Sequence, residues 1–129
     1  MRKMLIAAAV LIAGGMTETA ATPSQEADRW ALENAREVGE PENCIQLNRI
    51  RSSKVRSGDV IDFEMIDGRI MRSRLPHRCP GLSFEERFSY STSLTRLCSV
   101  DTITVFDGSG MRGASCGLGR FQEVEIAER

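Results

Sequence analysis

DVIDFEMIDGRIMRSR (residues 59–74) predicts an antiparallel β-hairpin, because apolar and polar residues alternate on both sides of an Asp-Gly pair. A two-residue loop would place Phe63 opposite Arg72. A three-residue loop ending at the glycine places Phe63 opposite Met71 instead. It also places Asp62 opposite Arg72, so that apolar pairs with apolar and acid with base. We therefore expect the three-residue loop, with its glycine in the left-handed position of a bulge.

Short β-segments surround this hairpin on both sides. They are CIQLNRIRSSKV (44–55), LSFEERFSY (82–90), RLCSV (96–100), DTITVF (101–106) and GASCGLGRFQEVEI (113–126). The first shifts phase at Ile50, which indicates a bulge or a strand end. The second alternates apolar and polar residues throughout and predicts one strand. The fold class that follows is α+β and β-rich: one helix, then six or seven strands in a curved antiparallel sheet or a small, partly open barrel.

The segment TPSQEADRWALENAREVGEP (22–41) predicts the N-terminal helix. Thr22 and Gln25 have the spacing of a capping box, and a proline occupies the first helical position. Apolar residues recur at helical spacing: Ala27, Trp30, Ala31, Ala35 and Val38. We expect Trp30 to pack this helix onto the domain, and the glycine and proline near residue 41 to end it.

The first 21 residues have the pattern of a secretory signal peptide. A short basic start precedes an apolar run over residues 4–15, and small residues then offer a cleavage site after Ala21. The run is shorter than the ~20 residues of a membrane-spanning helix. We therefore expect a periplasmic or secreted mature chain that starts at Thr22, with no stable membrane span after cleavage.

Four cysteines lie in the predicted mature chain: Cys44, Cys79, Cys98 and Cys116. An even number of cysteines in an exported chain indicates two disulfides, so residues 42–129 form one disulfide-stapled domain. Three pairings are possible. The turns CPGL and CGLG look like facing turns, which favours Cys44–Cys98 with Cys79–Cys116. Close C-x2-C pairs, which zinc sites use, are missing, so no metal site is expected.

The formal net charge of the chain is −1, but basic residues gather in its middle. Between residues 44 and 79 there are eight basic and four acidic residues. A basic patch on the hairpin, formed by Arg69, Arg72 and Arg74, could bind an anionic partner. The alternative is a mixed surface whose arginines meet nearby carboxylates. Nucleic acid is not an expected partner, because the domain as a whole is not basic.

Motifs that suggest catalysis or cofactor binding lack their required context. GSGMRG (108–113) matches G-x-G-x-x-G, but no βαβ unit can follow it, so a hairpin turn is expected there. The single histidine, His77, lies beside Cys79 in a corner restricted by Pro76 and Pro80. We expect a loop histidine and a stapling cysteine. The sequence therefore predicts no catalytic residue, no cofactor and no metal.

Four segments together resemble a family of small exported proteobacterial proteins known only as a domain of unknown function. They are CIQLNRIR (44–51), RCPGL (78–82), LCSVDTITV (97–105) and SCGLGRF (115–121). The match spans residues 43–124 and includes all four cysteines. The resemblance implies a periplasmic or secreted protein with a short N-terminal extension. It implies no catalytic or binding residue.

Three functional hypotheses follow from the sequence. The first is a non-enzymatic module that binds an envelope protein or an envelope surface. The second is an inhibitor of an envelope enzyme, resembling lysozyme inhibitors and acting through DGSGMRGAS (107–115), or a small periplasmic enzyme. The third is redox chemistry at Cys79, which requires a free thiol. The identity of the partner and the oligomeric state stay open.

Overall fold

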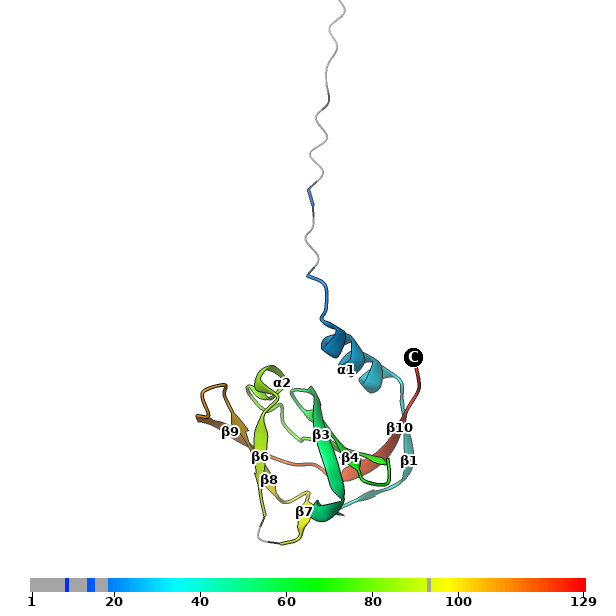
Figure 1. Cartoon of the computed structure of the whole chain (residues 1–129), viewed down its shortest axis with the longest axis vertical. Coiled ribbons are helices and arrows are strands. Elements are labelled where there is room, and N and C mark those ends of the chain that lie inside the picture. Colours follow the sequence, from blue (N-terminus) through cyan, green and yellow to red (C-terminus); the bar gives the residue numbers. More distant parts are fainter. Residues whose placement is uncertain (1–8, 10–13, 16–18, 93) are drawn as a thin grey trace, which may run out of the picture.

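The computed structural model describes residues 9, 14–15, 19–92 and 94–129 (Figure 1). The helices in these residues are α1 (Pro23–Glu33), α2 (Leu82–Glu85) and the 3-10 helix η1 (Leu47–Arg49). The strands are β1 (Ala35–Glu42), β2 (Cys44–Gln46), β3 (Ile50–Ser57), β4 (Val60–Met65), β5 (Ile70–Arg74), β6 (Phe88–Ser91), β7 (Arg96–Cys98), β8 (Thr102–Phe106), β9 (Arg112–Gly117) and β10 (Phe121–Ile126). The predicted signal peptide falls largely on residues outside this part. No helix of the described residues is long and apolar enough to cross a membrane.

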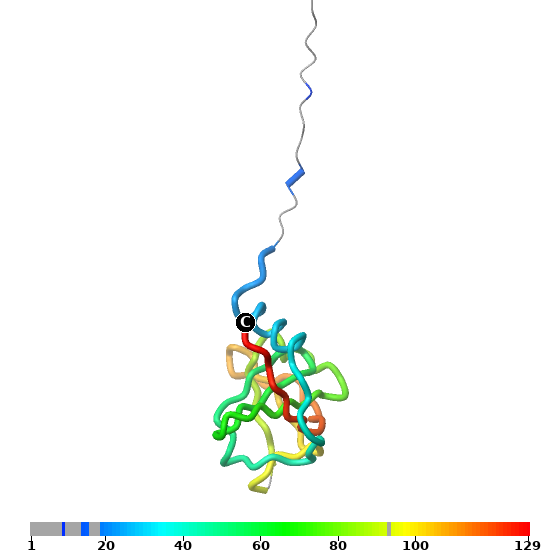
Figure 2. The backbone as a smooth tube through the Cα atoms, turned by 90° about the vertical axis from the view of Figure 1, so that its right-hand side faces the viewer, coloured from blue at the N-terminus to red at the C-terminus, as the bar shows by residue number. Residues whose placement is uncertain are grey.

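The strands form three antiparallel sheets, and none of these closes into a barrel. Their orders are β1-β10-β5-β4-β3, β2-β7 and β6-β8-β9. The predicted class, β-rich α+β with an N-terminal helix and antiparallel sheets, is confirmed. The described residues contain ten strands rather than the predicted six or seven, because the segments 44–55 and 113–126 each form two strands and residues 35–42, expected largely in the helix, form β1. The tube in Figure 2 shows the C-terminal end of the chain beside α1.

The β4–β5 hairpin has the register that the sequence predicts. Phe63 pairs with Met71, and Asp62 pairs with Arg72. The Met65 N–H donates to the Arg69 carbonyl at 2.8 Å, which closes a three-residue loop. The last loop residue, Gly68, has φ +89°, a conformation that glycine adopts without steric strain. The pairing of side chains across the strands therefore determined the loop length.

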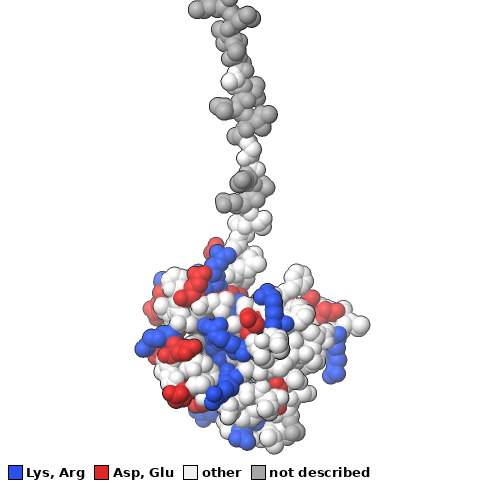
Figure 3. Space-filling model, turned by 180° about the vertical axis from the view of Figure 1, so that it is seen from behind, with Lys and Arg blue, Asp and Glu red and all other residues white. Residues whose placement is uncertain are grey.

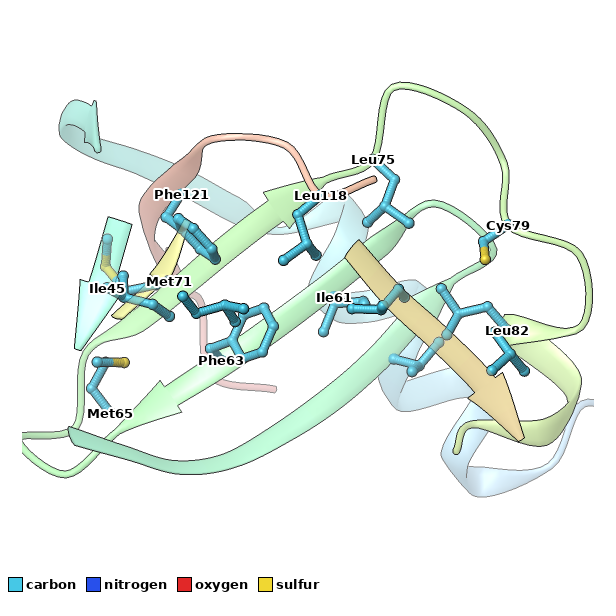
Figure 4. Close-up of a cluster of buried hydrophobic side chains, with 14 residues drawn as sticks. Ile45, Ile61, Phe63, Met65, Met71, Leu75, Cys79, Leu82, Leu118 and Phe121 are labelled. Atoms are coloured by element: carbon cyan, nitrogen blue, oxygen red, sulfur yellow. The ribbon is translucent and has the colours of Figure 1, made fainter. Parts of the chain in front are cut away.

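One hydrophobic core joins the five-stranded sheet to the β6-β8-β9 sheet. Its buried members are Ile45, Val55, Ile61, Phe63, Met65, Met71, Leu75, Cys79, Leu82, Leu97, Ile103, Val105, Leu118 and Phe121. Figure 4 shows these side chains directed to one side of the β4–β5 hairpin. The Phe63 ring makes edge contacts with Phe121 at 5.7 Å and with Phe88 at 6.5 Å between ring centroids. Aromatic packing thus links β4 to both β10 and β6.

Both disulfides have the predicted pairing. Cys44–Cys98 joins directly opposed residues of β2 and β7. Cys79–Cys116 ties the loop before α2 to β9. Because all four cysteines are oxidised, the hypothesis of a free thiol at Cys79 is wrong. Two disulfides fit an oxidising, extracytoplasmic compartment.

The corner around His77 is structural. Leu75 N–H donates to the Asp59 carbonyl at 2.8 Å, and Cys79 N–H donates to the Gly58 carbonyl at 2.7 Å. These bonds hold both ends of the corner against the turn between β3 and β4. His77 between them is exposed, as expected for a loop residue.

The N-terminal helix is shorter than predicted. The capping box is present, since the Gln25 N–H donates to the Thr22 hydroxyl and the Gln25 side chain accepts from the Thr22 N–H. However, α1 ends at Glu33 and the chain continues directly into β1. Ala35 and Val38, expected on the apolar stripe of the helix, pair instead with β10. The free edge of β10 offered these residues strand pairing, which outweighed their helical spacing.

The prediction that the segment 82–90 forms one strand is wrong. Gly81 (φ +81°) starts the one-turn helix α2, and Glu86 (φ +54°) ends it before β6 begins. Leu82 is buried, whereas Phe84 is 87% exposed, so alternation there does not reflect a sheet face. Period-two alternation over so few residues does not exclude a helical turn.

Candidate functional site

The predicted patch of Arg69, Arg72 and Arg74 does not form as one surface. Arg72 is buried, with only 2% of its surface exposed. Its Nε donates to Asp62 Oδ1 at 2.7 Å and its Nη2 to Asp62 Oδ2 at 2.9 Å. Nη2 also donates to the Ala31 carbonyl at 3.1 Å, which joins α1 to the sheet. The prediction that Arg72 lies on the surface is therefore wrong, because Asp62 opposes it in the register.

Arg69 is exposed but already has two acidic partners. Its Nε donates to Asp67 at 2.9 Å and its Nη1 to Glu123 at 3.5 Å. The hydrogen bond with Asp67 raises the pKa of the Arg69 guanidinium. Hydrogen bonds from the Arg69 N–H and side chain lower the pKa of Asp67. This end of the hairpin thus has little free positive charge.

Arg72 belongs to a chain of four charged residues beneath α1. Arg56 donates to Asp62 through Nε at 3.0 Å and to Asp28 of α1 through Nη1 at 2.9 Å. Burial opposes the charge of Arg56, but its hydrogen bonds to Asp28 and Asp62 outweigh burial and raise the pKa of the guanidinium. Two arginines and two aspartates make the chain neutral.

Arg74 instead faces a hollow of about 310 Å³ on the sheet. We call this the arginine hollow, and its lining residues are Glu37, Pro41, Arg72, Arg74, Arg120, Gln122 and Val124. They come from β1, β5 and β10, which are neighbours in the sheet although far apart in the sequence, and from Arg120, which directly precedes β10. Gln122 lies opposite Arg72 in the β5–β10 register. The sequence prediction missed Arg120 and Gln122.

A bulge in β1 shapes one wall of the hollow. The register between β1 and β10 shifts between Val38 and Glu42, around Gly39 at φ +68°. The Gln122 side-chain amide donates to the Val38 carbonyl at 3.0 Å and to the Gly39 carbonyl at 3.1 Å. These bonds satisfy carbonyls that the interrupted ladder leaves unpaired.

The backbone beside Arg74 and Arg120 is tightly packed. A Cβ atom on Gly119 would lie 1.9 Å from the Arg74 carbonyl oxygen, so only glycine fits there. The Ser73 hydroxyl donates to the Gly119 carbonyl at 2.9 Å and accepts from its N–H at 3.0 Å. The two arginines therefore project from a fixed backbone.

Charge is unevenly distributed around the arginine hollow. Glu37 is the one acid among the described residues that line it. Arg74 and Arg120 are exposed, and no described carboxylate forms an ion pair with either. The face drawn in Figure 3 carries both basic and acidic side chains, as the mixed-surface alternative predicts. The hollow is thus where unneutralised arginines meet.

Residues 107–111 form the turn between β8 and β9, as the glycine pattern of GSGMRG predicted, and residues 112–115 belong to β9. Asp107 Oδ1 accepts from the N–H groups of Ser109 and Met111, each at 2.9 Å, and from the Ser109 hydroxyl at 2.6 Å. These bonds, first that from the Ser109 side chain, lower the pKa of Asp107. Met111, the last residue of the turn, is 66% exposed. The turn is therefore internally braced and presents one large apolar side chain.

Neither a metal site nor a matching relative points to a function. The described residues contain no group of three or more His, Cys, Asp or Glu that could hold a metal ion. Comparison with known proteins found no matching family model, curated protein or solved structure.

Proposed function

We propose that the protein is an exported, non-enzymatic module that binds an envelope protein or an envelope surface. The observation that carries this proposal is the arginine hollow. Its two exposed arginines, Arg74 and Arg120, line one hollow and form no ion pair with a described carboxylate. The hollow offers groups that bind an anion, and its described lining contains no serine, cysteine or histidine that could act as a nucleophile.

Export is part of this proposal and has two independent supports. The first 21 residues have the composition of a signal peptide. The two disulfides require an oxidising compartment to form. The resemblance to a family of small exported proteins agrees with a periplasmic or secreted location. We expect a mature protein that begins at Thr22 and retains both disulfides, which intact-mass measurement of the exported protein would test.

Crosslinking in the native envelope tests the binding function. The full chain is expressed with its own N-terminus, crosslinked in place, and its partners are identified by mass spectrometry. We expect the double variant Arg74→Glu/Arg120→Glu to lose at least about 90% of the crosslinked partner. Reversing two charges would replace attraction with repulsion at the hollow.

Arg87→Glu is the matched control for this experiment. Arg87 is also exposed but lies between α2 and β6, outside the arginine hollow. Partner recovery with this control should equal that of the wild type. The same crosslinked partner at the same yield from the double variant would refute the proposed role of the hollow.

A second function, inhibition of an envelope enzyme, is favoured by the braced turn between β8 and β9. A loop that is rigid before binding loses less conformational entropy when it enters an active site. The exposed Met111 would be the inserted side chain. A variant with residues 107–111 replaced by a two-residue turn should then lose inhibition of the target enzyme. Full inhibition by this variant would show that the loop is not the inhibitory element.

The bracing of this turn predicts a specific pH dependence. The pKa of Asp107 in the folded protein lies below its ordinary value of about 3.9. Its stabilising bonds are therefore complete above pH ~3.9 and are lost as the pH falls through the folded pKa. The amide resonances of Ser109 and Met111 should titrate together with a midpoint below 3.9, and Asp107→Asn should abolish that titration. A midpoint at or above 3.9 would contradict the bracing.

A further inference from the structure

We infer that the arginine hollow binds a single carboxylate group, presented by a small acid or by the end of a peptide chain. This inference rests on the proposed binding function and specifies its ligand chemistry. Three features of the hollow support it: the buried guanidinium of Arg72 in its lining, the two exposed arginines Arg74 and Arg120, and a net charge that one negative charge balances.

One residue that lines the hollow, Arg72, has a buried polar atom without a hydrogen-bond partner among the described residues. Nε and Nη2 of Arg72 are bound to Asp62 and Ala31, but Nη1 is buried and has no hydrogen-bond partner among the described residues. Arg72 lines the hollow, whereas Asp62 and Ala31 do not. Nη1 therefore lies on the edge of the guanidinium that is turned away from Asp62. A buried donor of this kind favours a bound oxygen acceptor.

Two hydrogen bonds hold Arg120, which lines the hollow, in a defined orientation. Arg120 donates through Nε to Asn43 Oδ1 at 3.1 Å and through Nη2 to the Pro41 carbonyl at 3.4 Å. These contacts, one with Pro41 of β1 and one with Asn43 directly after it, hold its guanidinium in place beside the hollow. Arg74, on the tightly packed backbone beside Gly119, supplies the second one. Paired guanidinium groups match the planar oxygens of a carboxylate.

The charge of the hollow determines how many negative charges it balances. Arg72 is neutralised by Asp62 within the buried chain of four charged residues. The remaining groups are Arg74 and Arg120, which are positive, and Glu37, which is negative. Their sum is one positive charge. A monoanion such as a carboxylate balances this charge, whereas a phosphate dianion would leave one negative charge in excess beside Glu37.

The remaining lining residues suggest what the carboxylate is attached to. Pro41 and Val124 are apolar and lie in the same hollow of about 310 Å³. A volume of this size accommodates a few heavy atoms beside the carboxylate. A short aliphatic acid, or the last one or two residues of a peptide, would place its apolar part on these side chains.

Ligand titration by two-dimensional NMR tests this inference on the exported protein. The probes are acetyl-alanyl-alanine, the same peptide with its C-terminus amidated, propionate and inorganic phosphate. We expect saturable shifts at residues 37–41, 72–74 and 119–124 with the free peptide acid or propionate, and none with the amide. A Kd of the order of millimolar is expected for ligands of this size.

Variants locate the binding groups. Arg74→Gln and Arg120→Gln should each weaken carboxylate binding about tenfold or more, because each removes a charge-assisted hydrogen bond. Arg74→Lys should give an intermediate loss, since it retains charge but not the planar fork. Arg87→Gln should bind as the wild type does. The two-dimensional NMR spectrum of each variant, recorded without ligand, tests whether that variant is folded.

The outcomes separate this inference from the proposed function. Peptide acid binding more tightly than propionate supports a chain end as the ligand, and equal binding supports a small acid. Phosphate binding as tightly as the acids, equal binding of the amide, or no shift around the hollow would each overturn the carboxylate inference. If partner crosslinking still depended on Arg74 and Arg120 in that case, the binding function would stand with a different ligand.

Discussion

Replacing Asp62 by alanine should lower the free energy of unfolding by about 3–5 kcal/mol. Asp62 is 3% exposed and is the partner of both Arg56 and Arg72. The side chain of Arg72 is only 1% exposed, so water cannot replace the lost carboxylate. Arg56 keeps Asp28, but Arg72 would remain as a buried charge without a counter-charge. Urea unfolding followed by the fluorescence of Trp30 measures the effect.

Glu64→Ala is the matched control, because Glu64 lies on the same strand and the same face two residues further on. Its ion pair with Arg51 is longer, at 3.3 Å, and more exposed. Its removal should cost no more than about 1 kcal/mol. Adding Arg72→Met to Asp62→Ala should recover part of the loss, since it removes the uncompensated charge. An Asp62→Ala variant as stable as Glu64→Ala would show that the buried pair does not hold α1 to the sheet.

Removing the Cys79–Cys116 disulfide should lower stability by about 4 kcal/mol, within a general range of 2–5. The bond spans 37 residues and ties the corner before α2 to β9. Without this disulfide the unfolded chain gains conformational entropy, whereas the folded chain gains little. The free energy of unfolding therefore falls. The double variant Cys79→Ala/Cys116→Ala, unfolded in urea without reductant, gives the value.

The second disulfide provides the comparison. Cys44–Cys98 spans 54 residues, so the chain-entropy model gives Cys44→Ala/Cys98→Ala a loss only slightly larger. Similar losses in the two variants would support that model. A loss below about 1 kcal/mol on removing Cys79–Cys116 would instead show that the prolines and backbone bonds of the corner hold it without the disulfide.

The parts of the fold that the sequence predicted correctly depend on local pairing. The hairpin register followed from matching Asp62 with Arg72 and Phe63 with Met71, which are ten and eight residues apart. The capping box of α1 involves residues three apart. The disulfide pairing is an exception to this locality, because the paired cysteines are 54 and 37 residues apart and only the similarity of two turns favoured it. In the other two cases the residues that decide the structure could be compared directly in the sequence.

The parts that it missed depend on distant neighbours. Ala35 and Val38 fit a helix locally, but β10, about 85–90 residues later, pairs with them. Arg72 was placed on a surface because its own strand does not reveal that α1 covers it through Ala31. Arg120 and Gln122 belong to the candidate site only because β10 lies beside β5. A single sequence contains no local signal for such sheet order.

The position of β10 in the sheet has a consequence for how the chain reaches its native state. The first strand, β1, pairs only with the last, β10, which in turn pairs with β5. A ribosome-bound or translocating chain that has not yet delivered residues 121–126 therefore has no place to dock β1. Strand β1 must therefore wait for residues 121–126, whereas α1 can already contact β3 and β5 through Arg56 and Arg72.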